Sequence, residues 1–342
     1  MDLSVICPVF NTDPVLINEA IRSVLDQAGP HAAELILVDD CSTSRETHAA
    51  LHDAAASDRR IRVVFQARNT GPGQARATGI AHAAHDWIGF IDSDDSWPKN
   101  KLDQAQAVLD EAPDTRWIGG NYTTLLPTGE KRSSRRLTPP RSGAEAGRSA
   151  HRFATPELTR LLVGDWLPLG ASLVRKDLIA AAGGFNPRLI YGEDWLLHLR
   201  MSRLAPMDFL ETETYVLNRK GESMMHSLGR LSAELARSAQ FARRDPLLRP
   251  ARRELRWFCY NTYKDAAMNN ALNNRKLRGL YFALLALSVD PREIGEILLF
   301  LRLLPVSGPA LADGLRRYST AEQVILADLT RGAGIASSQA SI

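Results

Sequence analysis

The chain has 342 residues, 44% of them hydrophobic and 24% charged, which is ordinary for a globular protein with a sizeable core. Its 42 Lys and Arg nearly balance 39 Asp and Glu, and a net charge of +3 is too small to indicate a nucleic-acid-binding protein. The three cysteines stand at unrelated spacings, so they indicate neither a zinc site nor a disulfide framework and favour a reducing compartment.

No stretch of the sequence predicts export or a membrane span. The start, MDLSVICPVFN, lacks a basic stretch followed by a long apolar run. The runs LYFALLALSV and ILLFLRLLPV each have about half of the roughly 20 residues that cross a bilayer, and Arg302 interrupts the second. We therefore expect a cytoplasmic protein without a transmembrane segment.

The first hundred residues alternate between strand and helix patterns. Short apolar, β-branched runs predict strands at 3–10, 34–40, 61–66 and 87–91, and helical spacing predicts helices at 14–27, 47–56 and 71–85. This alternation indicates an α/β fold with a mostly parallel sheet, in which the carboxyl ends of the strands share one edge and ligands collect there.

Polar residues follow each of these predicted strands. In chain order they are Asn11, then Asp39 and Asp40, then Asn69, and finally Asp92, Asp94 and Asp95 in the stretch WIGFIDSDD. Carboxylates this close together repel one another without a cation, whereas Mg²⁺ or Mn²⁺ takes one or two carboxylates and completes its shell with water and substrate phosphate. The pattern predicts a divalent cation that serves a diphosphate, with a solvated turn as the alternative.

Two other binding motifs, an EF-hand calcium loop and a dinucleotide-binding loop, match the sequence only in part. The positions of an EF-hand calcium loop would be Asp92, Asp94, Ser96 and Asp103. Trp97 stands where that loop requires glycine, and a strand precedes it instead of a helix. The run GPGQAR begins like a dinucleotide-binding GxGxxG, but Arg76 replaces the third glycine and the run follows the third strand instead of the first.

The composition changes at residues 128–152, which are rich in Pro, Gly, Ser and Arg and have no apolar period. We expect a flexible basic insertion, either a solvated loop or a flap whose arginines meet an anionic substrate or a membrane surface. A strand at 170–176 and a helix from Gly192 follow, and beyond about residue 225 the pattern is almost entirely helical. We predict a catalytic domain at 1–222 and a C-terminal helical extension at 223–342.

Six motifs occur in the order and approximate spacing of one known family. They are SVICPVFN, ELILVDDCST, the set Asn69, Gly71, Ala75 and Arg76, then WIGFIDSDD, GGFN and GEDWLLHLR. Over about residues 2–220 the chain resembles the family 2 glycosyltransferases. The resemblance implies a GT-A (Rossmann-like) fold, a nucleotide-sugar donor, Mn²⁺ or Mg²⁺ as cofactor, and inversion at the anomeric carbon by direct displacement.

The resemblance also implies a nucleotide pocket. Its residues would be Pro8, Phe10, Asn11, Arg76 and either Asp39 or Asp40, one of which accepts a hydrogen bond from the base, most often uracil. In the acidic cluster, Asp92 or Asp94 would contact the ribose and Asp94 or Asp95 would bind the metal. That metal would neutralise the charge of the departing nucleoside diphosphate.

The pair Glu193 and Asp194 is the candidate for the acceptor side. In the family the Asp of this pair deprotonates the attacking hydroxyl, so Asp194 is the expected base and Glu193 the reserve; the alternative is acidic charge that opposes a helix dipole. Trp166 and Trp195 could stack on sugars, although core packing is the commoner role. His226 could be a metal or phosphate ligand, with an ordinary surface position as the alternative.

The extension carries two apolar helical patterns flanked by Arg and Lys. Packing on the catalytic domain or in a homodimer is the leading interpretation, and peripheral contact with the inner face of a membrane, which suits a lipid-linked acceptor, is the alternative.

Taken together, the resemblance predicts a hexosyltransferase that moves a sugar, most often UDP-linked, to a hydroxyl of a saccharide or lipid-linked saccharide in polysaccharide or glycoconjugate biosynthesis. A nucleotidyltransferase is one alternative, but it usually has a Gly-rich phosphate loop directly after the first strand, where CPVFNTDP has none. The other is a non-catalytic nucleotide-sugar-binding protein, which the intact Glu193–Asp194 pair disfavours.

Overall fold

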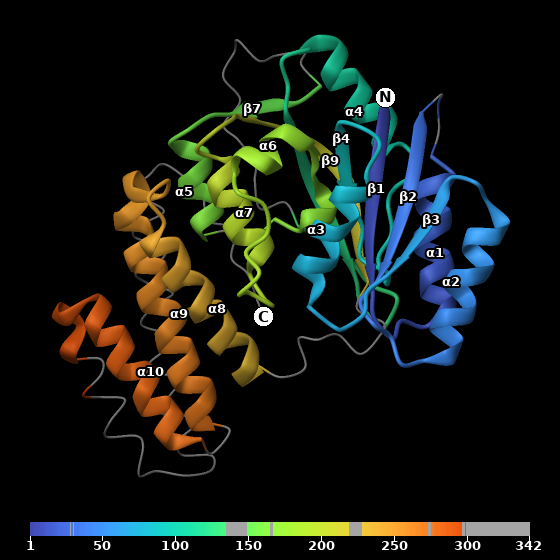
Figure 1. Cartoon of the computed structure of the whole chain (residues 1–342). Helices are drawn as coiled ribbons and strands as arrows, with labels where there is room; N and C mark the ends of the chain where they lie inside the picture. Colours follow the sequence, from blue (N-terminus) through green and yellow to red (C-terminus); the bar gives the residue numbers. More distant parts are fainter. Residues whose placement is uncertain are drawn as a thin grey trace. The chain divides into compact units, whose positions relative to one another are not determined.

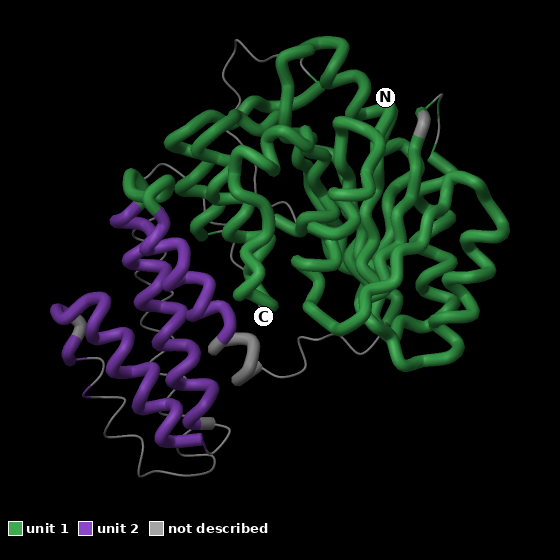
Figure 2. Tube along the Cα trace, viewed as in Figure 1, with its two compact units in different colours: residues 1–224, 246–251 green, residues 225–245, 252–342 purple. Residues whose placement is uncertain are grey.

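The structure is a computed structural model that describes residues 1–27, 29, 31–134, 149–164, 167–218, 228–272, 275–295 and 298. The chain divides into two compact units, which Figure 2 colours separately. Unit 1 comprises residues 1–224 and 246–251, and unit 2 comprises 225–245 and 252–342. The predicted boundary at 222 and 223 lies outside the described residues.

One mixed sheet organises the described part of unit 1. Its strands are β1 (Asp2–Val9), β2 (Ala32–Asp39), β3 (Ile61–Phe65), β4 (Trp87–Phe90), β5 (Trp117–Leu125), β6 (Lys131–Ser134), β7 (His151–Phe153), β8 (Leu173–Arg175) and β9 (Met207–Asn218). Their order is β3-β2-β1-β4-β8-β5-β9-β7, with β6 paired to β5. Strands β3, β2, β1 and β4 are mutually parallel, so their carboxyl ends lie at one edge.

Right-handed crossovers determine on which face of the sheet each connecting helix lies. Helices α1 (Pro14–Leu25) and α2 (Arg45–Ser57) carry the chain outward from β1 to β3, whereas α3 (Pro72–His82) carries it back across to β4. A right-handed connection therefore puts α1 and α2 on one face of the sheet and α3 on the other. Figure 1 shows this arrangement, with α3 on the opposite side of β1 from α1 and α2.

Local signals set where these helices begin. The Asp13 side chain accepts a hydrogen bond from the Val15 amide, and Pro14 opens α1. Ser44 caps α2 by accepting from the Thr47 amide at 3.1 Å. The predicted bounds differ from these by a few residues; for example, the helix predicted at 71–85 ends at His82.

The second half of unit 1 adds antiparallel pairs and further helices. Strand β8 pairs antiparallel with β4 and β5, while β5 and β9 are parallel with register shifts around Asn121. The helices here are α4 (Lys101–Glu111), α5 (Glu157–Gly164), α6 (Lys176–Ala181), α7 (Glu193–Met201) and the short 3₁₀ turn η2 (Leu169–Ala171). The segment predicted as a strand at 170–176 is thus partly helical.

The predicted flexible insertion at 128–152 has a strand at each end: β6 lies within the predicted bounds, and β7 overlaps their C-terminal end. A tight turn joins β5 to β6: the Gly129 amide donates to the Leu126 carbonyl, and Gly129 has φ +83°. The turn fixes the antiparallel register, so main-chain hydrogen bonds stabilise β6 although its side chains are polar. Residues 135–148 of the insertion lie outside the described residues.

Unit 2 contains, where described, α8 (Leu228–Arg244), α9 (Arg252–Leu272), α10 (Lys276–Val289) and the short 3₁₀ turn η5 (Pro291–Glu293). Helix α9 packs against both of the others through small side chains, which include Ala236, Ala239, Ala266, Ala267, Ala283 and Ala286. Among the described residues, no helix has both the length and the hydropathy to cross a bilayer.

Candidate active site

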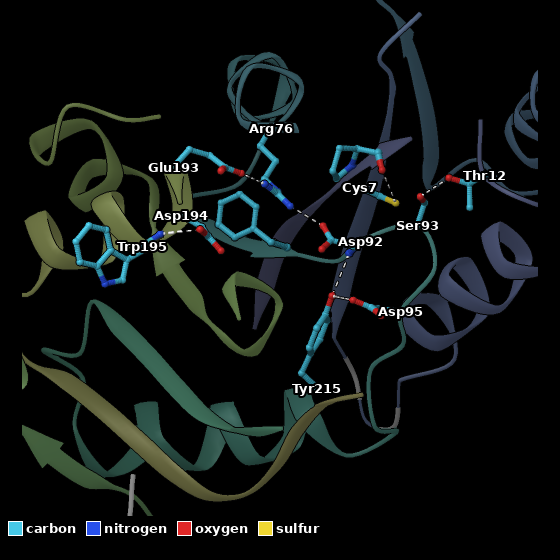
Figure 3. Close-up of polar contacts among 12 residues, drawn as sticks. Cys7, Thr12, Arg76, Asp92, Ser93, Asp95, Glu193, Asp194, Trp195 and Tyr215 are labelled. Atoms are coloured by element: carbon cyan, nitrogen blue, oxygen red, sulfur yellow. Dashed lines mark hydrogen bonds and ion pairs between the residues drawn. The ribbon is translucent and has the colours of Figure 1, made fainter. Parts of the chain in front are cut away.

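The site lies at the carboxyl edge of the parallel strands, where the strand order reverses between β1 and β4. Such a reversal opens a crevice between the two loops that leave these strands. Here the loops are tied together, since the Thr12 and Ser93 hydroxyls are 2.7 Å apart (Figure 3). The crevice therefore brings the predicted nucleotide-binding loop next to the acidic cluster.

Asn11 joins the loops after β1 and β2. Its Oδ1 accepts hydrogen bonds from the amides of Thr43 and Ser44 at 2.7 and 3.0 Å, and its own amide donates to the Ser42 hydroxyl at 2.9 Å. Asn11 has φ +50°, a left-handed conformation that asparagine tolerates well. Beside it, the Phe10 ring is 48% exposed at the strand end, whereas Pro8 is buried within β1.

The two aspartates after β2 have different surroundings. Asp40 is fully engaged, because its two carboxylate oxygens accept from the amides of Thr70 and Gly71, both at 2.8 Å. These bonds position the N-terminus of α3. The Asp39 carboxylate accepts only from the Ser42 amide at 3.2 Å and lies 3.5 Å from Nε2 of His48, so it keeps unused acceptor capacity.

The acidic loop after β4 is anchored by Asp95. Its Oδ2 accepts from the Tyr215 hydroxyl at 2.5 Å and its Oδ1 from the Asn218 amide at 2.6 Å, both in β9. Burial and the nearby charges of Asp92 and Asp94 raise the pKa of Asp95 well above its usual value. Asp95 therefore holds the loop against β9, while Asp92 and Asp94 remain half-buried.

A buried lysine supports the same loop. Lys101 Nζ donates to the Gly170 carbonyl at 2.5 Å and lies 3.8 Å from the centre of the Trp97 ring. Trp97 in turn donates through Nε1 to the Phe90 carbonyl at 3.1 Å. Burial lowers the pKa of Lys101 well below its usual value. These contacts fold the segment after the acidic cluster back onto β4.

Arg76 connects the acidic loop to α7. Its Nη2 donates to Asp92 Oδ1 at 2.6 Å and its Nη1 to Glu193 Oε1 at 2.8 Å, as Figure 3 shows. Burial by itself disfavours the Arg76 charge, but the carboxylates of Asp92, Glu193 and Asp194 outweigh it and raise the pKa of Arg76. Carboxylates about a hundred residues apart in sequence thus share one buried guanidinium.

Glu193 opens α7 after Gly192, which has φ +69°. A methyl group at Gly73 would lie 2.8 Å from Glu193 Cγ, so glycine at this position lets α3 approach the start of α7. Burial, followed by the neighbouring charge of Asp194, raises the pKa of Glu193 to about 8. Glu193 therefore favours the protonated form near neutral pH.

Asp194 is half-buried and faces the same site. Its Oδ1 accepts a hydrogen bond from the Trp195 amide at 2.7 Å. Trp195 itself is a core residue, because it is 5% exposed and its Nε1 donates to the Leu162 carbonyl at 2.8 Å. The structure therefore agrees with the core-packing interpretation of Trp195, and Trp166 and His226 lie outside the described residues.

The predicted metal site fits a cation that takes only one or two ligands from the protein and the rest from water and substrate phosphate. In the part of the chain that the structure describes, no group of three or more His, Cys, Asp and Glu is arranged to hold a metal ion. Magnesium bound with a diphosphate needs only one or two protein carboxylates, which Asp92 and Asp94 can provide. Asp95 suits this role poorly, since both of its oxygens already accept hydrogen bonds.

The structure brings most of the predicted residues to one edge and adds several that sequence patterns did not indicate. The additions are Thr12, Ser93, Trp97, Lys101 and Tyr215. Their roles depend on partners that are distant in sequence: Tyr215 reaches Asp95 across 120 positions. An aromatic or lysine in a loop carries no local signal of such a partner.

The sequence is similar to those of known glycosyltransferases. Residues 4–163 match the model of glycosyl transferase family 2. Putative teichuronic acid biosynthesis glycosyltransferase TuaG of Bacillus subtilis is 41% identical over 102 residues, 30% of this chain and 39% of TuaG. Succinoglycan biosynthesis protein ExoO of Rhizobium meliloti is 38% identical over 101 residues, 30% of this chain and 28% of ExoO. The chain thus spans well under two thirds of either relative.

Among solved structures, S. aureus TarS 1-349 in complex with UDP-GlcNAc has a TM-score of 0.62 at 18% identity, covering 100% of this chain and 95% of that chain. This likeness confirms the predicted α/β GT-A fold with a helical C-terminal part. Residues 4–163 are thus similar to glycosyl transferase family 2, and the chain shares its fold with TarS.

Proposed function

We propose that the chain is an inverting, metal-dependent glycosyltransferase that moves a sugar from a UDP-linked donor to a hydroxyl of a saccharide or lipid-linked saccharide. The observation that carries this proposal is the Arg76 bridge, in which one buried guanidinium binds Asp92 on the donor side and Glu193 on the acceptor side. A site that only bound a nucleotide would have no need to hold an acidic pair beside it.

On the donor side, Asp39 is the better candidate for the base contact, because Asp40 is fully occupied by Thr70 and Gly71. The exposed Phe10 ring and the Asn11 loop would contact the same nucleotide. Asp94, with Asp92 beside it, would hold Mn²⁺ or Mg²⁺. When bound, that ion neutralises negative charge on the departing nucleoside diphosphate.

On the acceptor side, Asp194 would act as the general base. It would accept the proton of the attacking hydroxyl as the oxygen bonds to the anomeric carbon and the bond to the diphosphate breaks. Glu193 is less suited, since burial favours its protonated form and Arg76 occupies Oε1. Two adjacent carboxylates with separated pKa values are a common way to divide such roles.

The family relatives support the acceptor class. The names of TuaG and ExoO refer to teichuronic acid and succinoglycan biosynthesis, and the structure of TarS contains UDP-GlcNAc. We therefore propose that the chain acts in polysaccharide or glycoconjugate biosynthesis. A homodimer through the C-terminal helices stays a prediction.

The proposal is tested with full-length protein and a panel of UDP-, GDP- and dTDP-sugars, with and without Mn²⁺. We expect Asp194→Asn to lower nucleoside diphosphate release by about 10²- to 10⁴-fold while donor affinity, measured by calorimetry, is unchanged. Asp53→Asn, an exposed aspartate on α2, is the matched control and keeps full activity. Asp94→Ala should abolish the response to Mn²⁺.

Three outcomes would contradict the proposal in different ways. Unchanged turnover in Asp194→Asn would remove its role as base. Failure of every donor to bind, together with no effect of Asp94→Ala, would remove the glycosyltransferase assignment itself. A protein that binds a donor but never releases the diphosphate would instead be the non-catalytic binding protein.

A further inference from the structure

Unit 2 differs from unit 1 in charge. Residues 225–245 and 252–342 hold 16 Lys and Arg against 10 Asp and Glu, a net charge of +6, although the whole chain carries only +3. The catalytic unit is therefore net negative. Such an asymmetry within one chain indicates an anionic partner for the basic part.

The positive charge converges at one end of α9. Arg243, Arg252, Arg253 and Arg256 line an open hollow of about 490 Å³, and the described residues that line it are all arginines. Arg243 in the last turn of α8 suits the helix dipole, but Arg252 and Arg253 in the first turn of α9 oppose it. Helix stability therefore does not account for them, whereas an anion in the hollow would offset their mutual repulsion.

Helix α10 carries the second observation. Its small residues Gly279, Ala283, Ala286 and Val289 are buried, as Ala-rich packing on α9 requires. Phe282, Leu285 and Leu287 pack against the same cluster. Three other large apolar residues point outward: Leu277 is 84% exposed, Tyr281 57% and Leu284 54%. These three are spaced four and three residues apart and so share one face of the helix. We refer to Leu277, Tyr281 and Leu284 as the apolar face of α10.

Basic side chains border this face at both ends of α10. Arg275, Lys276 and Arg278 stand at its N-terminus. At its C-terminal end, Asp290 pairs with Arg292 at 2.8 Å and lies 3.9 Å from Arg256, which belongs to the arginine hollow. The apolar face and the basic groups are thus parts of one unit, in the combination typical of a helix that lies in a lipid interface.

We propose that unit 2 is a peripheral membrane-binding module for surfaces of anionic phospholipid. The apolar face of α10 enters the boundary between head groups and acyl chains, and the arginine hollow receives lipid phosphate. Helix α10 has 14 residues, so its length of about 21 Å is shorter than the roughly 30 Å hydrocarbon core and it lies in the interface instead of spanning it.

Charge favours this occupant over a second copy of the chain. Two copies meeting through unit 2 would bring a net charge of +6 against +6, whereas an anionic surface complements the same groups. Each Lys or Arg close to such a surface adds to its binding, and the Leu and Tyr side chains add burial. The inference is independent of the reaction proposed for unit 1.

The test is sedimentation of full-length protein with vesicles of phosphatidylcholine alone and with about 30 mol% phosphatidylglycerol. We expect binding to the anionic vesicles at about 0.1 M NaCl and at least a tenfold loss of it at about 1 M, where charges are screened. Soluble glycerol phosphate, added as a competitor, separates a free phosphate site from a lipid surface: it should displace the protein little.

Two double variants assign the binding to the two features. Replacing Leu277 and Leu284 with Glu should lower vesicle binding by about tenfold or more, and replacing Arg252 and Arg253 with Gln should do so by about tenfold. Val15→Glu on α1, which is 64% exposed, is the matched control and should bind as the parent does. Far-UV circular dichroism and donor binding establish that each variant is folded.

Three results would overturn the proposal. One is no sedimentation of the parent protein with anionic vesicles at low salt. Another is equal binding to both vesicle types that neither double variant reduces. The third is a dimer, measured by light scattering, that the Leu277 and Leu284 replacements dissociate while vesicle binding is absent, because a second copy would then cover the apolar face.

Discussion

Two acidic segments form the site, the loop after β4 and the start of α7. Each contains one buried carboxylate next to at least one half-buried carboxylate. In the loop after β4, Asp95 accepts hydrogen bonds from the neutral Tyr215 hydroxyl and Asn218 amide. At the start of α7, Glu193 instead accepts from the Arg76 guanidinium, whose other arm holds Asp92. We call the Asp95 contacts the neutral anchor and the Arg76 contacts the ionic anchor. The neutral anchor fixes the conformation of the loop after β4, whereas the ionic anchor fixes the distance between this loop and the start of α7.

The comparison leads first to a prediction about Arg76. Arg76→Met should lower the free energy of unfolding by about 3 kcal/mol, because it leaves the buried Glu193 without its hydrogen-bond donor and Asp92 without its cation. Arg116→Met is the control, since the pair that Arg116 makes with Asp177 is largely exposed and should contribute about 1 kcal/mol or less. Urea unfolding measures both, and equal losses would mean that Arg76 is no special link between the segments.

The second prediction concerns the pH dependence of stability. The folded-state pKa of Glu193 is about 8 against an ordinary value of 4.5, so its contribution is fully present below pH 4.5 and is lost as pH rises toward 8. The unfolding free energy of the parent should therefore fall relative to that of Glu193→Gln by a few kcal/mol over this range. Denaturant titrations of both proteins at several pH values measure it, and parallel profiles would contradict the burial argument.

Gly73→Ala tests how closely α3 must approach α7. The added methyl group would lie 2.8 Å from Glu193 Cγ, so the side chain must move away from Arg76, and we expect about tenfold lower turnover. Gly164→Ala in α5 is the matched control, because nothing lies within 4 Å of its added methyl group. Equal activity of the two variants would show that α3 and α7 tolerate a larger separation at Gly73.

Tyr215→Phe should have the smallest effect of the four and tests the neutral anchor. It removes the hydroxyl that Asp95 accepts from, at a cost of about 1–2 kcal/mol in unfolding free energy. Tyr281→Phe, at an exposed position of α10, should change it by less than about 0.5 kcal/mol. If Tyr215→Phe cost as much as Arg76→Met, the neutral and ionic anchors would not differ in the way described.

Much of the first hundred residues could be predicted from local patterns. Strands β1, β2 and β4 are apolar runs that end in polar residues, and α1 and α2 begin at recognisable caps. The later strands gave weaker signals. Strand β5 contains Gly119 and Gly120, and β9 contains the polar run ETET, so neither has the period of a buried strand. Their places in the sheet depend on long-range pairing.

The sequence by itself carried the resemblance to the family 2 glycosyltransferases. It also determined the position of the acidic residues, because parallel strands deliver the residues after their carboxyl ends to one edge. Only the tertiary structure decided which carboxylates hold the loops in place. Asp40 and Asp95 are occupied by donors from other segments, and Arg76, which binds Asp92, also reaches Glu193 across 117 positions. The physical reason is that acceptor capacity depends on which donors packing brings within about 3 Å, and the chain order does not show those neighbours.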